Sequence, residues 1–144
     1  MTNFDEYRDV FVVADTIDDA VHPVTYELIG QARRIAKELG QLVQVMLLGE
    51  NVQAEAEELV AHGADIVHVF ESPLLKYYTT DGYTKVLTDF FEDHKPNILL
   101  IGATNNGRDL APRMSGRMQN GVVADCTILT VDTAEGLVEW TRPA

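Results

Sequence analysis

The stretch Asn97-Ile-Leu-Leu-Ile-Gly-Ala-Thr-Asn-Asn-Gly-Arg108 decides the fold. Its first half, 97–101, is a short apolar run that predicts a strand buried on both faces of a sheet. Gly102 ends that strand, and a polar loop leads into a predicted helix over 108–118, with Pro112 in its first turn. A strand followed directly by a helix is the repeating unit of α/β proteins.

The same unit recurs on the N-terminal side of this stretch. Apolar runs predict strands, and apolar residues at steps of three and four predict helices. Two further strand-like runs, joined by a turn-forming segment over 132–136, predict a C-terminal strand hairpin. The expected strands are 10–14, 42–48, 66–70, 97–101, 126–131 and 136–140, and the expected helices are 23–39, 53–61, 82–94 and 108–118.

This alternation predicts an α/β fold with a doubly wound, mostly parallel sheet and helices on both faces. The expected strand order is 3-2-1-4-5, with the hairpin at the C-terminal side. A chain of 144 residues, without an internal repeat or linker, is the size of one domain, so we expect residues 1–144 to form one.

Composition excludes several classes of protein. Apolar residues make up 46% and charged residues 24% of the chain, which is typical of globular proteins. A net charge of −12 disfavours nucleic acid as a partner. No apolar run is long enough for membrane insertion. The N-terminus has no signal-peptide character, and the single cysteine, Cys126, suits a reducing compartment, so we expect a cytoplasmic location.

In such a sheet, ligands bind beyond the carboxyl ends of the strands, where the winding reverses. That crevice would lie between the loop 15–22 and the loop 102–107. The second loop is the best candidate site, because amides at a helix start attract anions. It also opens a locally basic stretch, 105–120, that holds Arg108, Arg113 and Arg117 against Asp109 alone. Two interpretations remain open: a tight turn before a helix with surface arginines, or a site for an anion or an acidic partner.

Other functional motifs are excluded because the residues that would carry their chemistry are missing. Gly102 and Gly107 match the glycines of a P-loop, but Arg108 and Asp109 replace its lysine and its hydroxyl residue. We expect no metal site, because the four histidines (His22, His62, His68 and His94) lie far apart in the sequence. Cys126 has no histidine nearby and is expected to be a packing residue. We interpret Asp15, Asp18 and Asp19 as solvated loop acids, and Tyr77, Tyr78 and Tyr83 as cover for a sheet edge or interface. We therefore predict no catalytic residues and no enzyme.

Three stretches together resemble one family. They are Pro23-Val-Thr-Tyr-Glu-Leu-Ile-Gly-Gln-Ala-Arg33, Gly102-Ala-Thr-Asn-Asn-Gly-Arg-Asp-Leu-Ala-Pro-Arg113, and Val123-Ala-Asp-Cys-Thr127 followed by Thr141-Arg-Pro-Ala144. These are similar to the N-terminal domain of the α subunit of electron transfer flavoproteins, and the resemblance covers essentially the whole chain.

The resemblance implies a heterodimeric carrier that passes electrons from flavin dehydrogenases, such as acyl-CoA dehydrogenases, to another acceptor. In the family a C-terminal domain of the α subunit holds the redox FAD. The resemblance implies that this domain lies outside residues 1–144, so we expect no cofactor on these residues alone. The β subunit binds AMP, or a second FAD in bifurcating members. The implied role of this domain is assembly with the β subunit, and Asn105, Asn106, Gly107 and Arg108 are expected to bind a cofactor or to face that subunit.

One alternative from a different class remains, a free-standing adenine nucleotide-binding module of the universal-stress type. That family shares the expected sheet topology and has a Gly-x-x-Gly loop after its fourth strand. Gly102-Ala-Thr-Asn105 lacks the second glycine, and Ser115-Gly116 reverses the order of the next expected pair.

Overall fold

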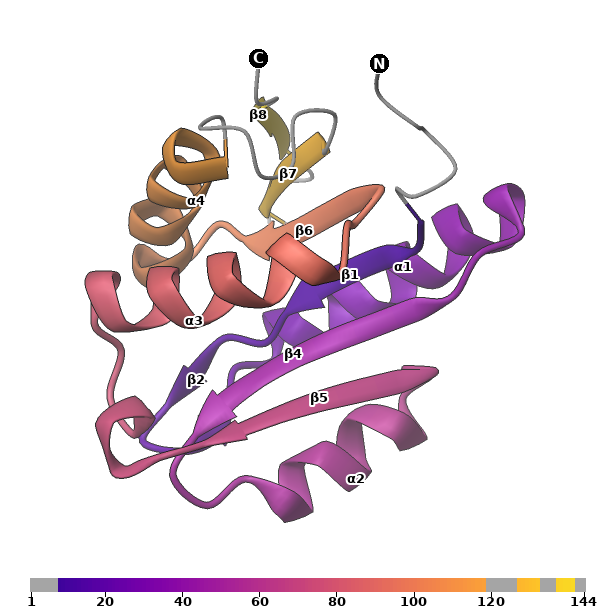
Figure 1. The fold of residues 1–144 in the computed structure, drawn as a ribbon. Coiled ribbons are helices and arrows are strands. Elements are labelled where there is room, and N and C mark those ends of the chain that lie inside the picture. Colours follow the sequence, from indigo (N-terminus) through magenta and orange to yellow (C-terminus); the bar gives the residue numbers. More distant parts are fainter. Residues whose placement is uncertain (1–7, 119–126, 133–136, 142–144) are drawn as a thin grey trace.

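The computed structural model describes residues 8–118, 127–132 and 137–141 (Figure 1). Six strands in these ranges form one sheet in the order β5-β4-β1-β6-β7-β8. All neighbouring pairs are parallel except β7 and β8, which form an antiparallel hairpin. The predicted α/β class, strand order and hairpin are therefore confirmed. The strands are β1 (Val10–Val13), β4 (Val43–Gly49), β5 (Ile66–Glu71), β6 (Ile98–Gly102), β7 (Thr127–Asp132) and β8 (Leu137–Thr141).

Helices cover both faces of this sheet, as the alternating pattern predicts (Figure 1). Helices α1 (Val24–Leu39) and α2 (Gln53–Ala61) pack on one face. Helices α3 (Thr80–Asp93) and α4 (Asn105–Met118) pack side by side on the other. The crossovers thus change face between α2 and α3, which is the reversal that creates a crevice at the carboxyl ends of β1 and β6.

The core has two layers because side chains alternate along the central strands. In β1, Val10 and Val12 pack under α1, whereas Phe11 and Val13 pack under α3 and α4. The four side chains are at most 4% exposed. This two-sided burial explains why the run reads as continuously apolar, without the polar alternation of a half-exposed strand.

Helix α1 forms because its apolar residues share one stripe. Leu28, Ile29 and Ala32 are fully buried against the sheet. The helix ends at Gly40, which has a left-handed φ of 66° and donates its N–H to the carbonyls of the last turn. Both predicted boundaries of this helix are confirmed to within a residue.

The two loops expected between elements contain structure of their own. The loop after β1 forms a small antiparallel hairpin of β2 (Thr16–Ile17) and β3 (Ala20–Val21). Its turn residues, Asp18 and Asp19, have φ of 50° and 64°. Two consecutive left-handed residues match the twist of a tight hairpin, and aspartate tolerates this conformation. The connection after β5 contains the 3-10 helix η2 (Pro73–Leu75).

The predicted start of the last helix, Arg108, is wrong. Helix α4 begins at Asn105 because Thr104 satisfies its first amides. The Thr104 side-chain oxygen accepts the N–H of Gly107 at 3.1 Å, and the Thr104 carbonyl accepts the N–H of Arg108 at 2.8 Å. Pro112 therefore lies inside the helix, and Arg108 is its fourth residue. Helix α3 likewise begins at Thr80, two residues before the predicted start.

Cys126 and the predicted hairpin turn at 133–136 lie outside the described residues.

Candidate functional site

The two loops predicted to form the crevice line one pocket of about 410 Å³. We call this pocket the crevice. It lies at the carboxyl ends of β1 and β6, between the β2–β3 hairpin and the start of α4. The lining residues are Asp15, Ile17, His22, Ala103, Thr104, Asn105 and Asn106.

Hydrogen bonds within the protein occupy most of the polar groups of the crevice wall. The Thr104 hydroxyl donates to the carboxylate of Asp15. The N–H of Asp15 donates to the hydroxyl of Thr25 at 3.0 Å, and Nδ1 of His22 accepts the N–H of Val24 at 3.0 Å. Because Thr104 also accepts the N–H of Gly107, this residue caps α4 and fixes Asp15 at once. A carboxylate at the mouth opposes the binding of a phosphate here.

The structure separates the four residues that the sequence singles out. Asn105 and Asn106 line the crevice, and their side-chain amides could hydrogen-bond to a ligand or a partner. Arg108 is exposed on α4 and is not part of the lining. Gly107 is buried below the crevice, where a Cβ would lie 1.7 Å from the carbonyl oxygen of Gly102. A glycine at 107 therefore lets α4 approach the end of β6.

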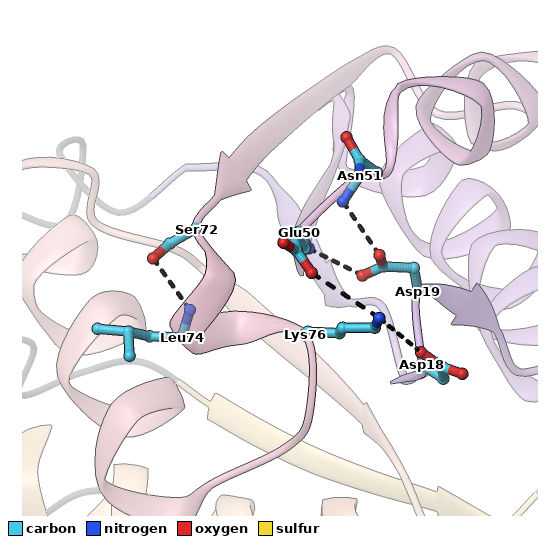
Figure 2. A network of polar contacts seen from close by, with 7 residues as sticks. All are labelled: Asp18, Asp19, Glu50, Asn51, Ser72, Leu74 and Lys76. Atoms are coloured by element: carbon cyan, nitrogen blue, oxygen red, sulfur yellow. Dashed lines mark hydrogen bonds and ion pairs between the residues drawn. The ribbon is translucent and has the colours of Figure 1, made fainter.

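Asp15 and Asp19 are half-buried and hydrogen-bonded within the protein, contrary to the interpretation that the loop acids are solvated, whereas Asp18 is exposed as expected. The Asp19 carboxylate accepts the N–H groups of Glu50 at 2.8 Å and Asn51 at 3.1 Å (Figure 2). Lys76 lies between Asp18 and Glu50, with nitrogen–oxygen distances of 3.6 and 3.9 Å. The β2–β3 hairpin, the loop after β4 and the segment after η2 are thus joined by one polar network. The adjacent pair Asp18-Asp19 between two short apolar runs was the sequence signal for this turn.

A second polar cluster joins α4 to the start of α3. The hydroxyl of Tyr78 donates to the Asp109 carboxylate at 2.7 Å, and the hydroxyl of Thr80 donates to the same oxygen. These two bonds, with the charge of Arg113, lower the pKa of Asp109. Burial, followed by the hydrogen bond to Asp109, raises the pKa of Tyr78. Arg113 pairs with Asp81 at 2.6 Å, so one arginine of the predicted basic stretch already has a carboxylate partner.

Tyr83 is a core residue and not the edge cover that the sequence suggested. It is 3% exposed, and its hydroxyl donates to the carbonyl of Leu75 at 2.8 Å. Tyr77, in contrast, is 62% exposed.

Among the residues that the structure describes, no group of three or more His, Cys, Asp or Glu could hold a metal ion. His68, one of the four histidines, has a structural environment and no metal-binding partners among the described residues. Its Nε2 hydrogen-bonds to the Gln44 side-chain oxygen at 2.6 Å, and its ring packs at 4.7 Å from that of Phe90. Burial, and then the nearby His94, lower the pKa of His68, so the neutral imidazole is favoured. Within the described ranges, no helix is both long and apolar enough to cross a bilayer.

Comparison with known proteins extends this picture. The family described as electron transfer flavoprotein domain matches residues 10–144. The electron transfer flavoprotein subunit alpha of Megasphaera elsdenii is 45% identical over 139 residues, which are 96% of this chain and 41% of that protein. The lactate dehydrogenase (NAD(+),ferredoxin) subunit LctC of Acetobacterium woodii is 46% identical, over 96% of this chain and 33% of that protein. This chain thus spans only about two fifths of such relatives, or less.

Among solved structures, the universal stress protein from Archaeoglobus fulgidus in complex with dAMP has a TM-score of 0.48 and 17% identity. The match covers 72% of this chain and 89% of that one. The family assignment rests instead on the sequence relatives: since the family's match extends over 10–144 and the relatives align along 96% of the residues, this chain belongs to the electron transfer flavoprotein family.

Proposed function

We propose that residues 1–144 are the N-terminal domain of the α subunit of a heterodimeric electron transfer flavoprotein. The alignment with relatives named subunit alpha, at 45% identity along 96% of the chain, carries this proposal. The larger remaining part of such a subunit would hold the redox FAD. The whole protein would carry electrons between flavin dehydrogenases, such as an acyl-CoA dehydrogenase, and another acceptor.

Within that carrier we assign this domain a role in assembly with the β subunit and no chemical step. The crevice supports this assignment, because the Thr104 hydroxyl group is held between Asp15 and the cap of α4, and Nδ1 of His22 accepts a backbone N–H. The residues present also do not fit a flavin. The N-terminal amide of α4 at Gly107 is capped by Thr104, and the carboxylate of Asp15 lies where a pyrophosphate would approach.

The exposed rim of the crevice is the surface that we propose to face the β subunit. Asn105 and Asn106 offer amide donors and acceptors there, and Arg108 offers a permanently charged fork one turn along the same helix. Gly107 contributes indirectly, because it brings α4 close to the sheet and so places its neighbours.

The alternative function, storage or sensing of an adenine nucleotide, is opposed by the same geometry. A nucleotide-binding module presents free amides to the phosphates, whereas here Thr104 caps the amide of Gly107 and the Asp15 carboxylate lines the same pocket.

A binding experiment separates the two functions. The purified chain is titrated by calorimetry with an electron transfer flavoprotein β subunit, and separately with ATP. We expect association with the β subunit and no ATP binding at millimolar concentration. The variant Asn105→Ala/Asn106→Ala/Arg108→Ala should weaken the β-subunit complex, whereas Arg117→Ala, on the same helix, should not. ATP binding without β-subunit binding would refute the proposal.

A further inference from the structure

A second pocket, at the opposite end of the sheet, is lined by three positively charged side chains. It lies at the amino ends of β4 and β5, beside the C-terminal half of α1, and measures about 350 Å³. We call it the amino-edge groove. Its lining residues are Arg33, Arg34, Ala36, Lys37, Gln41, Val43, Gly63 and Asp65.

The charge of this groove is unusual for the chain. Residues 9–72 contain twelve acidic residues and only three basic ones, and all three basic residues line the groove: Arg33, Arg34 and Lys37. Across the ranges that the structure describes, none of these three forms an ion pair, although Lys76, Lys85 and Arg113 all do. The dipole of α1 favours Lys37, in the last turn, but acts little on Arg33 and Arg34, which lie further from that end.

The groove is also partly preformed. A Cβ at Gly63 would lie 2.3 Å from a guanidinium nitrogen of Arg33, so the Arg33 side chain rests on the turn between α2 and β5. Gly63 has a φ of 118°, a conformation that side-chain-bearing residues rarely adopt. This contact holds a guanidinium group over the groove before any partner arrives, which lowers the entropy lost on binding.

Exposed aliphatic side chains lie at the same amino end of the sheet, outside the lining of the groove. Leu39 and Leu42 are each 45% exposed, and Ile66, at the first position of β5, is 38% exposed. Leu39 ends α1, and Leu42 immediately precedes Val43 of the groove. Arginine is enriched at protein interfaces relative to the rest of the protein surface.

We propose that the amino-edge groove is a docking site for an acidic, leucine-bearing segment of a partner protein. Charge complementarity identifies the occupant: carboxylates match the two guanidinium forks, and aliphatic side chains match Leu39, Leu42 and Ile66. A small phosphate compound offers the negative charge but no aliphatic contact, so it is the competing ligand in the test below. The site lies opposite the crevice, so it goes beyond the β-subunit contact proposed above.

The test uses a synthetic amphipathic peptide of about twelve residues, with Leu on one face and Glu on the other. Binding to the 144-residue chain is measured by fluorescence anisotropy and mapped by amide chemical shifts. We expect shifts at residues 33–42 and 63–66, and weakening at high salt. Arg33→Gln/Arg34→Gln/Lys37→Gln should weaken binding at least about tenfold. The control variant Lys76→Gln/Lys85→Gln/Arg113→Gln removes the same charge from ion-paired positions and should bind normally.

The apolar half is tested by Leu39→Ser/Leu42→Ser, which should also weaken binding while the melting temperature stays close to that of the parent chain. Several outcomes overturn the proposal: no peptide binding, shifts centred elsewhere, or equal losses in the two charge variants. Binding of inorganic pyrophosphate at this groove while the peptide stays inert would identify a small-anion site instead, and would equally refute the proposal. A lysine-for-glutamate version of the peptide should not bind.

Discussion

The two ends of the sheet differ in how their charged side chains are used. At the carboxyl ends, Asp15, Asp19 and Asp109 each accept hydrogen bonds from another segment of the chain. At the amino ends, the cations of the amino-edge groove have no carboxylate partner among the described residues. The three carboxylates at the first end therefore stabilise the fold, whereas the three cations at the second end are left available for binding. Charge counted along the sequence does not reveal this difference.

The largest expected effect tests how closely α4 is fixed at the carboxyl end. Gly107→Ala places a Cβ against the carbonyl of Gly102, a backbone atom that cannot move aside. We expect the free energy of unfolding, measured by urea denaturation, to fall by about 3 kcal/mol. Gly116→Ala, in the same helix but with open space at its Cβ, is the matched control and should stabilise by up to about 1 kcal/mol. Equal effects at the two positions would contradict the close approach.

Substitutions in the polar network of the β2–β3 hairpin are expected to lower the free energy of unfolding by a smaller amount. Asp19→Asn keeps a side chain that tolerates the left-handed turn but loses the charge that accepts two backbone N–H groups. The expected loss is about 1 kcal/mol in the free energy of unfolding. Asp18→Asn removes only the exposed pairing with Lys76 and should cost at most a few tenths of a kcal/mol. If both variants behave alike, the network does not anchor the hairpin.

The cluster around Asp109 predicts a pH dependence. Its hydrogen bonds with Thr80 and Tyr78 lower the pKa of Asp109 in the folded protein, so the ionised form stabilises the fold. This contribution is complete above the ordinary aspartate pKa of about 3.9 and is lost as the pH falls below it, through the folded-state pKa. The difference in melting temperature between the parent chain and Asp109→Asn should therefore be constant near neutral pH and shrink below about pH 4. A difference that grows on acidification would reverse the assignment.

The smallest effect is expected at the amino end. Arg34→Gln removes an exposed cation that makes no ion pair within the described residues. The free energy of unfolding should change by less than about 0.5 kcal/mol. Thermal melts at low and high salt measure this, and a clear loss of stability would mean that the groove serves the fold and not a partner.

The fold was predictable because its decisive signals are local. Four apolar runs, each followed by a helical pattern, predicted the repeating strand–helix units, because these patterns depend only on residues close in the chain. The strand order then followed from the topology that such units adopt in doubly wound sheets. The start of α4 was missed for a physical reason. Asn105-Asn106-Gly107 is typical of a turn, but Thr104 caps the helix, and the buried Gly107 serves a contact with β6.

Some features of the candidate site were likewise predictable from the sequence, whereas others depend on the tertiary structure. The sequence by itself determined the α/β class, the position of the crevice and the family resemblance, because each follows from patterns within short segments. Only the tertiary structure decided which charges are satisfied. Thr104 reaches Asp15, far back in the chain, and Arg33 rests on Gly63 in the turn between α2 and β5. Such pairings depend on distances that arise when the sheet forms, so no local pattern of residues encodes them.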